Sequence, residues 1–334
     1  MSTPSVNREA MEIVKEICKN PSKYNVLVKK DPLGAHIIDA GINARGGFLI
    51  GELITKICLG GLGDTSLSLM SLGGIILPSI SIYTDYPSIS TLGSQMAGWR
   101  IRVGEYMAMG SGPARALALK PKGIYEKIGY RDEASKTVLV LETDREPPEE
   151  VIKIIAESCR VPPESLYIIV VPTASIAGLT QISGRVVEVG MYRLTELGLD
   201  PKIVLHASGQ APILPVHPDT IESMGRGNDA ILYGGLTYYV VEHGDDEHLR
   251  EITERATSLV SKDYGRPFSE IFREVGQDFY KIDPQIFAPA IITITNRKTG
   301  KTFTAGKINT EILLKSIGYP SQLQHLSHFT RSSK

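Results

Sequence analysis

The sequence predicts a mixed α/β protein with two domains, on three observations. Its 334 residues are more than one ordinary hydrophobic core organises, so the chain should divide. Hydrophobic residues make up 42% of the chain, which is enough to bury a sizeable core. Between residues 137 and 208, apolar strand patterns alternate with helical patterns, the order of elements that covers a sheet with helices.

The first third of the chain predicts two helices, over residues 5–19 and 48–58, on either side of a hairpin. The hairpin lies in "NVLVKKDPLGAHIIDAG", with its turn at residues 31–34. Residues 59–81 are rich in Gly, Ser, Leu and Ile and predict short buried strands joined by tight turns. A short helix is expected over residues 114–119.

The middle third has the clearest alternation. Buried strands are predicted for "TVLVLET", "SLYIIVVP" and "PKIVLHAS". A helix is predicted for "PPEEVIKIIAESC", with prolines at its start and acids in its first turn. "TASIAGLTQISGRVVEVGMYRLTELG" reads as a loop that becomes one helix ending at Gly198. No GxGxxG follows any of these strands, so a dinucleotide-binding fold is not supported.

The last third predicts a strand pair in "DAILYGGLTYYVVEH", bent at Gly234 and Gly235. An amphipathic helix follows in "DDEHLREITERATSLV", then a hairpin in "AIITITNRKTGKTFTAGKIN" turning at residues 298–300. "TEILLKSIG" is a final short helix, and the tail after Pro320 is polar. The charged segment 120–136 marks the expected boundary between an α/β domain over residues 1–125 and a second over 126–334. Whether the C-terminal strands return to the first domain stays open.

Composition excludes several classes of protein. The formal net charge of −1 lacks the basic excess of a nucleic-acid-binding protein. Three widely spaced cysteines fit a reducing compartment rather than a disulfide framework. The charged N-terminus does not read as a signal peptide, and no apolar run reaches the roughly 18 residues that a membrane span needs. We therefore expect a cytoplasmic protein with no membrane or nucleic-acid partner.

No sequence pattern points to a metal or to a serine nucleophile. The seven histidines include no HExxH pair and no set of three with the spacing of a catalytic zinc site. GxSxG, the motif of the hydrolase nucleophile elbow, is also absent. The expectation is a site without metal.

Two glycine-rich stretches are candidates for ligand contacts. "GSGP" at residues 110–113 precedes a predicted helix, and exposed amides at a helix start favour an anion. "GRGNDAILYGG" offers Asn228 and Asp229, which could hydrogen-bond a heterocycle or an anion. Both stretches have an alternative interpretation as ordinary turns.

The stretch "QISGRVVEVG" at residues 181–190 places Arg185 and Glu188 in an apolar run. Positions i and i+3 of a helix share a face, so the two charges are expected to meet. One interpretation is a surface ion pair of small energetic weight. The other is a functional site, because the preceding loop is small and polar and a carboxylate near a helix start stays ionised and available as a proton acceptor.

Four stretches together, "GLTQISGRVVEVGMYRL", "GSGPARAL", "GRGNDAILYGG" and "DPQIFAPA", resemble the methenyltetrahydromethanopterin cyclohydrolases of methanogenic archaea. The resemblance covers essentially the whole chain. It implies cytoplasmic homotrimers whose subunits have two α/β domains side by side with a large pocket between them. It implies reversible hydrolysis of the methenyl bridge of a pterin carrier, which is the substrate, with no further cofactor.

The resemblance assigns the catalytic pair of the family to Arg185 and Glu188. The methenyl bridge is an amidinium-like cation and already electrophilic, so the reaction needs a positioned water and a base rather than a metal. Glu188 would be that base, with Arg185 either orienting Glu188 or holding the water and substrate. Burial under bound pterin should partly offset the effect of the arginine on the carboxyl pKa. Further substrate contacts are expected from Gly110, Ser111, Gly112, Gln181, Ser183, Asn228, Asp229 and Tyr233, with Phe287 packing nearby.

Two other functions stay open at this stage. A non-catalytic pterin-binding or carrier protein of the same fold would perturb the methenyl chromophore only stoichiometrically. A metal-dependent hydrolase would be inhibited by chelators.

Overall fold

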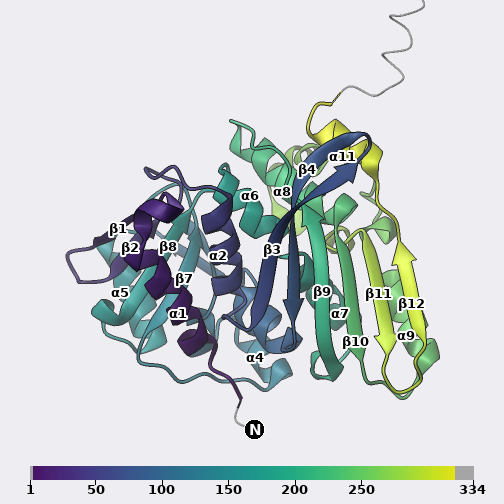
Figure 1. Cartoon of the computed structure of the whole chain (residues 1–334), viewed down its shortest axis with the longest axis horizontal. Helices are drawn as coiled ribbons and strands as arrows, with labels where there is room; N and C mark the ends of the chain where they lie inside the picture. Colours follow the sequence, from purple (N-terminus) through teal and green to yellow (C-terminus); the bar gives the residue numbers. More distant parts are fainter. Residues whose placement is uncertain (1–2, 320–334) are drawn as a thin grey trace, which may run out of the picture.

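Two six-stranded mixed sheets stand side by side and form the framework of the chain, as a computed structural model describes it for residues 3–319 (Figure 1). We call them the first sheet, with strand order β1-β2-β8-β7-β6-β5, and the second sheet, with order β12-β11-β10-β9-β4-β3. The predicted mixed α/β fold class is confirmed.

The first sheet is parallel at its centre and antiparallel at its edges. Its strands are β1 (Leu27–Lys30), β2 (His36–Asp39), β5 (Trp99–Val103), β6 (Tyr106–Ser111), β7 (Thr137–Glu142) and β8 (Leu166–Val171). Alternate residues of β7 face opposite sides, as the period of a strand requires. Val138 and Val140 pack with α1 (Val6–Lys19) and α2 (Phe48–Cys58), while Leu139 and Leu141 pack with α5 (Glu149–Cys159).

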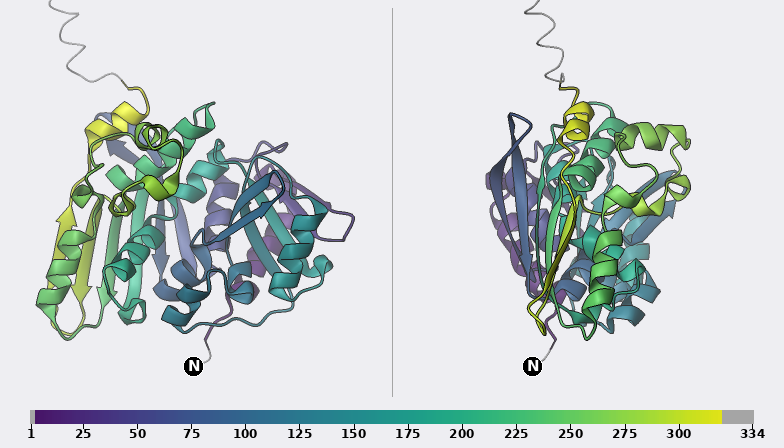
Figure 2. Two further views of the ribbon diagram at one scale, coloured as in Figure 1. Left: turned by 180° about the vertical axis from the view of Figure 1, so that it is seen from behind. Right: turned by 90° about the vertical axis from the view of Figure 1, so that its right-hand side faces the viewer.

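The second sheet carries three helices on the side away from the viewer in Figure 1, as the side view of Figure 2 makes plain. Its strands are β3 (Gly63–Leu72), β4 (Ile75–Thr84), β9 (Val204–Pro212), β10 (Leu236–Val241), β11 (Ile291–Asn296) and β12 (Thr302–Gly306). The three helices are α7 (Val186–Glu196), α8 (Thr220–Gly234) and α9 (Asp246–Arg255). Val186, Val187 and Met191 of α7 share one buried cluster with Tyr239 of β10.

Shorter helices pack against these elements. The α-helices are α3 (Ala114–Ala118), α4 (Lys122–Ile128), α6 (Ile176–Ser183), α10 (Phe268–Glu274) and α11 (Thr310–Ser316). A π-helix, Ser88–Gln95, packs against α7 and α4. Single 3-10 turns cover Pro21–Tyr24, Pro163–Ser165, Pro201–Ile203, Ser258–Val260, Phe279–Lys281 and Pro284–Ile286.

Most predicted elements are confirmed, including both hairpins and the helices α1, α2, α5, α9 and α11. The first helix begins at Val6 because the Ser5 side chain accepts a hydrogen bond from the Arg8 amide and caps it. The polar tail predicted after Pro320 lies outside the described residues.

Three predictions of local structure were wrong. Residues 63–84 form one hairpin of two ten-residue strands, and only two residues of the outer strand β3 are buried. The segment after β8 forms two helices, broken at Gly184, and not one. "DAILYGG" is the end of helix α8 and not a strand, since Asp219 caps a helix that runs through to Gly234.

The order of the strands along the chain also did not predict which strands share a sheet. Although β9 follows β7 and β8 along the chain, it does not join their sheet. It pairs with β4 and β10 in the second sheet. Each sheet therefore takes strands from both sides of residue 125. The boundary between residues 125 and 126 itself stays a prediction.

Close packing of α7 on the second sheet yields the first testable prediction. A Cβ on Gly190 would lie 2.1 Å from the Tyr239 hydroxyl, which itself donates to the Val187 carbonyl at 2.9 Å. We expect Gly190→Ala to lower the free energy of unfolding by about 1–3 kcal/mol through overpacking. Urea denaturation measures this, with Gly123→Ala as the matched control, because a Cβ there meets no atom within 4 Å. Equal stabilities for the two variants would contradict the close contact.

Candidate active site

Arg185 lies at the junction between α6 and α7, directly after the break at Gly184. A Cβ at position 184 would lie 2.5 Å from the Thr55 methyl carbon, so glycine lets this junction approach α2. The Arg185 side chain is only 7% exposed. A charged group so deep in the protein must be hydrogen-bonded, and its three nitrogens all donate.

The acceptors of the Arg185 guanidinium come from three separate elements. Nη1 donates to the Gln95 carbonyl of the π-helix at 2.6 Å, and Nη2 donates to Ser111 Oγ at the end of β6 at 3.0 Å. Nε and Nη2 both donate to Gln181 Oε1 on α6, at 3.2 and 2.9 Å. Arg185 thus holds the π-helix, the first sheet and α6 together.

Glu188 lies one turn further along α7 and is also 7% exposed. Among residues 3–319, no group donates a hydrogen bond to its carboxylate. Burial raises the pKa of this carboxyl to about 6, while the charges of Arg185 and Arg115 act in the opposite direction. The result is a buried carboxyl group that changes charge near neutral pH and has lone pairs free for a ligand.

The expected meeting of Arg185 with Glu188 was wrong. Within the described chain, no ion pair of 4.0 Å or less joins them, because the guanidinium turns toward the π-helix carbonyl, the serine and the glutamine. Arg185 has φ −86° and ψ 0°, so it precedes the regular turns of α7 and does not take the full i, i+3 geometry. The two roles predicted for Arg185, orienting Glu188 and holding water and substrate, both stay predictions.

A second buried arginine also binds the end of the π-helix. Arg115 on α3 donates from Nη1 to the carbonyls of Leu92 and Ser94, at 3.2 and 3.0 Å, and from Nε to the Lys120 carbonyl at 2.8 Å. The charge of Arg115 also lowers the pKa of the Glu188 carboxyl. The two guanidinium groups thus anchor the carbonyls at positions 92, 94 and 95.

The π-helix end leaves polar atoms without protein partners beside this site. Gln95 Nε2 donates to the Gly184 carbonyl at 2.9 Å, but Gln95 Oε1 and Ser94 Oγ are buried and have no partner in the described chain. Unpaired buried polar atoms of this kind are rare in folded proteins and usually meet a water or a ligand. A π-helix at the same place is typical of functional sites.

Gln181 connects Arg185 to a second carboxylate. Its Nε2 donates to Glu142 Oε2 at 3.4 Å, and Thr173 Oγ1 donates to Glu142 Oε1 at 2.5 Å. Glu142 is the last residue of β7 and is half-buried. The polar network therefore runs from the carboxyl end of β7 through α6 to the start of α7.

Gln95, Arg115 and Glu142 were not predicted as site residues from the sequence. Gln95 ends the run "SISTLGSQ", whose many small polar residues are a weak signal for a buried turn at a site. Arg115 lies within a predicted helix and Glu142 within a predicted strand, and nothing in their spacing distinguishes them as site residues. Only their burial beside Arg185 and Gln181 does so.

The other predicted site residues fall into two groups. Ser111 and Gln181 bind Arg185, Gly110 and Gly112 flank Ser111, and Ser183 is buried and donates to the Pro212 carbonyl at 2.8 Å. The second group lies on α8 or near α10, and no described contact joins it to Arg185 or Glu188.

In that second group, the Asn228 side chain donates to the Met224 carbonyl at 2.9 Å. Asp229 accepts from the Phe268 amide and the Ser316 hydroxyl, and burial raises the pKa of its carboxyl to about 7. Tyr233 donates to the Arg266 carbonyl at 2.6 Å. Phe287 packs against Phe268 with ring centroids 5.7 Å apart. Their role in binding substrate stays a prediction.

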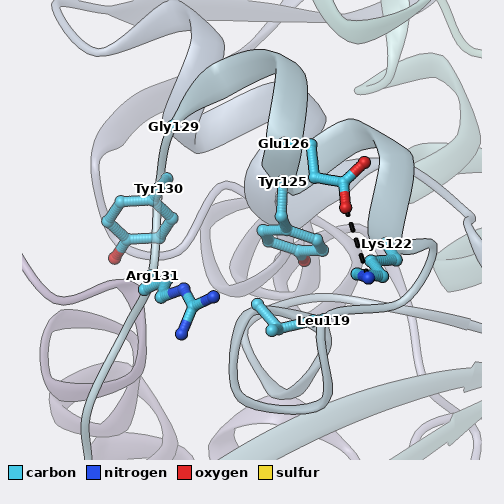
Figure 3. A pocket seen from close by; sticks show the side chains of 7 residues that line it. All are labelled: Leu119, Lys122, Tyr125, Glu126, Gly129, Tyr130 and Arg131. Atoms are coloured by element: carbon cyan, nitrogen blue, oxygen red, sulfur yellow. Dashed lines mark ion pairs between the residues drawn. The ribbon is translucent and has the colours of Figure 1, made fainter.

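A cavity of about 400 Å³ lies elsewhere, at α4. Figure 3 shows it between Leu119, Tyr125, Tyr130 and Arg131, with the Lys122–Glu126 ion pair of 3.4 Å at one side. It includes neither Arg185 nor Glu188 in its lining. The expected large pocket between the two domains stays a prediction.

Residues 3–319 contain no group of three or more His, Cys, Asp or Glu side chains placed to hold a metal ion. No helix within the same residues combines the length and the apolar character that crossing a bilayer requires.

The two-sheet framework defines the chain as a mixed α/β protein, and the buried residues Arg185 and Glu188 form its candidate site. The sequence matches the family model described as cyclohydrolase (MCH) over residues 5–317. It is 48% identical to the methenyltetrahydromethanopterin cyclohydrolase of Methanocaldococcus jannaschii, over 94% of this chain and 98% of the relative. The enzymes of the same name from Methanothermobacter marburgensis and Methanococcoides burtonii are 48% and 46% identical, over 94% of this chain and 99% and 98% of theirs. The chain belongs to the MCH cyclohydrolase family.

The raised pKa of the Glu188 carboxyl predicts a pH-dependent stability. Folding favours its protonated form, so the stabilisation is full below the ordinary pKa of 4.5 and is lost as the pH rises through about 6. Relative to Glu188→Gln, the free energy of unfolding of the wild-type protein should fall by about 2 kcal/mol between pH 4.5 and pH 7. Urea denaturation of both proteins across this range measures the difference, and a constant difference would rule out the raised pKa.

Proposed function

We propose that this protein catalyses the reversible hydrolysis of the methenyl bridge of methenyltetrahydromethanopterin, giving the formyl-pterin and a proton. One observation carries the proposal at the level of residues: Glu188 is a buried carboxylate without a hydrogen-bond donor in the described chain, one turn from an arginine with every nitrogen engaged. Family membership and the names of the relatives support the reaction class.

The chemistry needs little beyond a base and a positioned water. The bridge carbon lies between two nitrogens and shares their positive charge, so water can add without an external Lewis acid. As the oxygen–carbon bond forms, Glu188 takes a proton from the water, which general base catalysis requires to be within hydrogen-bond reach. One carbon–nitrogen bond then breaks, and the leaving nitrogen keeps the electron pair and takes up the hydroxyl proton of the adduct. The formyl group remains on the other nitrogen. One proton is released overall.

Burial and charge suit Glu188 to this role. A carboxyl with a pKa of about 6 is mostly ionised at neutral pH, yet is a stronger base than an exposed glutamate. Its negative charge also attracts the cationic bridge. Because the bound cation would favour the ionised form, we expect the pKa to fall when substrate binds.

Arg185 acts on the reacting oxygen rather than on Glu188. Its guanidinium has five N–H groups, and four hydrogen bonds within the described chain leave one Nη1 hydrogen for a ligand. That hydrogen can hold the attacking water or the formyl oxygen of the product. The other four bonds keep the group in place, so the site is organised before substrate arrives.

We also propose that the enzyme works in the cytoplasm as a homotrimer and needs no metal or other cofactor. The resemblance to the family supports the trimer and the compartment. The electrophilic character of the substrate supports a reaction without metal. Size measurement in solution and turnover in the presence of a chelator test these two points separately.

A pterin carrier without catalytic activity is the alternative function. The methenyl chromophore distinguishes the two, because an enzyme removes its near-ultraviolet absorbance at catalytic amounts of protein. A carrier changes that absorbance only in proportion to the protein added.

The variant Glu188→Gln removes the proposed base and tests its role directly. We expect Glu188→Gln to lower kcat by a factor of about 10² to 10⁴. In the wild-type protein, kcat/KM should fall about tenfold per pH unit below about pH 6, as Glu188 takes up a proton. Glu196→Gln is the matched control, since Glu196 is on the same helix and pairs with Lys127 at the surface. Near-wild-type turnover of Glu188→Gln would exclude Glu188 as the base.

A further inference from the structure

Glu142 holds a carboxylate at a place where α/β proteins bind ligands. It ends β7, whose parallel neighbour β8 ends at Val171, and ligands of α/β sheets gather at the carboxyl ends of such strands. The group is half-buried, and no Lys or Arg of residues 3–319 forms an ion pair with it. Its partners are a hydroxyl, Thr173 Oγ1 at 2.5 Å, and an amide, Gln181 Nε2 at 3.4 Å. A partly desolvated carboxylate with only neutral partners retains acceptor capacity for a ligand.

The orientation of the Gln181 amide is fixed by chemistry. A guanidinium can only donate, so the oxygen of Gln181 must face Arg185 and its NH₂ must face Glu142. The side chain is 1% exposed, which leaves it little freedom to turn. The Gln181 amide therefore links Glu142 directly to Arg185, through one hydrogen bond on each side.

Met109 and Ser111 lie on the same face of the first sheet as Glu142. Met109 pairs with Glu142 across β6 and β7, and directly paired residues of neighbouring strands point to the same side. Ser111, two residues beyond Met109, points to that side as well and accepts from Arg185. The Met109 side chain is 37% exposed and offers a polarisable apolar surface beside the carboxylate. A flat ring that packed against the Met109 side chain would therefore have the Glu142 carboxylate at one end and Arg185 at the other.

We propose that Glu142 recognises the hydrogen-bond donor edge of the pterin ring, formed by its ring N–H and the adjacent exocyclic amino group. This rests on the proposed function, because it takes the pterin carrier as substrate. Two neighbouring N–H donors match the two oxygens of a carboxylate as the fork of an arginine does. The donor edge and the methenyl bridge lie at opposite ends of the fused rings. Binding the edge at Glu142 therefore directs the bridge toward Arg185 and Glu188.

Two small rings that differ only at the recognised edge provide a test independent of turnover. 6-Methylpterin carries the amino group, whereas 6-methyllumazine has a carbonyl oxygen in its place and presents an acceptor to Glu142. We expect the full-length wild-type protein to bind the pterin about 10- to 100-fold more tightly, as measured by ligand-observed NMR titration. Glu142→Gln should bring the ratio of the two affinities close to one, because an amide serves the acceptor as well as the donor.

Kinetics with the methenyl substrate give the second measurement. Glu142→Gln should raise KM about 10- to 100-fold and change kcat by less than about threefold. Glu142→Asp keeps the negative charge but shortens the side chain by one methylene group. This variant should lose most of the preference for pterin, and it replaces the glutamine variant in the test if that variant does not fold. Glu146→Gln is the matched control, as Glu146 follows the same strand but pairs with Lys29 at the surface.

Two results would overturn the proposal: an unchanged pterin preference in folded Glu142 variants, or a loss of kcat at constant KM. The second would mean that Glu142 serves only to orient Gln181 and Arg185. If neither ring binds measurably, the KM and kcat values of the variants decide. A protein that prefers pterin but does not consume the methenyl chromophore would retain this recognition and refute the proposed function.

Discussion

The burial of the Arg185 guanidinium is the constraint on which the rest of the site depends. A buried charge left without partners costs several kcal/mol, so its acceptors have to be in place whenever the protein is folded. Those acceptors are the Gln95 carbonyl, Ser111 Oγ and Gln181 Oε1, from segments far apart in the sequence. The need to satisfy one side chain thereby fixes the π-helix, the end of β6 and the junction of α6 with α7 relative to one another.

This arrangement explains why Glu188 is left without a donor. Arg185 directs four of its five N–H groups to other acceptors, so the Glu188 carboxylate keeps its lone pairs. Desolvation outweighs the effect of the two arginine charges on the pKa of Glu188. Such a group makes the ionised protein less stable than one with glutamine at this position. Sites that bind and react with a ligand commonly retain a destabilising group of this kind.

The secondary structure could be predicted where local rules dominate. Ser5 caps α1, prolines and acids begin α5, and a glycine turn joins β11 to β12, all of which short stretches of sequence encode. The prediction failed where packing across the fold decides. β3 reads as buried because it contains Leu and Met, but it is the outer strand of its sheet, and α8 tolerates glycines because its neighbours approach closely.

The sequence by itself determined the fold class and most of the elements, because periodicity and caps are local properties. It also marked Arg185 and Glu188 as candidates, through the resemblance of several long stretches to a known family. Only the tertiary structure decided which strands share a sheet, where the Arg185 guanidinium points, and that Gln95, Arg115 and Glu142 lie beside it. Those features rest on burial and on hydrogen bonds between segments far apart in the sequence, such as the bond from Arg185 to Gln95, which are 90 residues apart. Spacing along the chain carries no information about contacts of that kind.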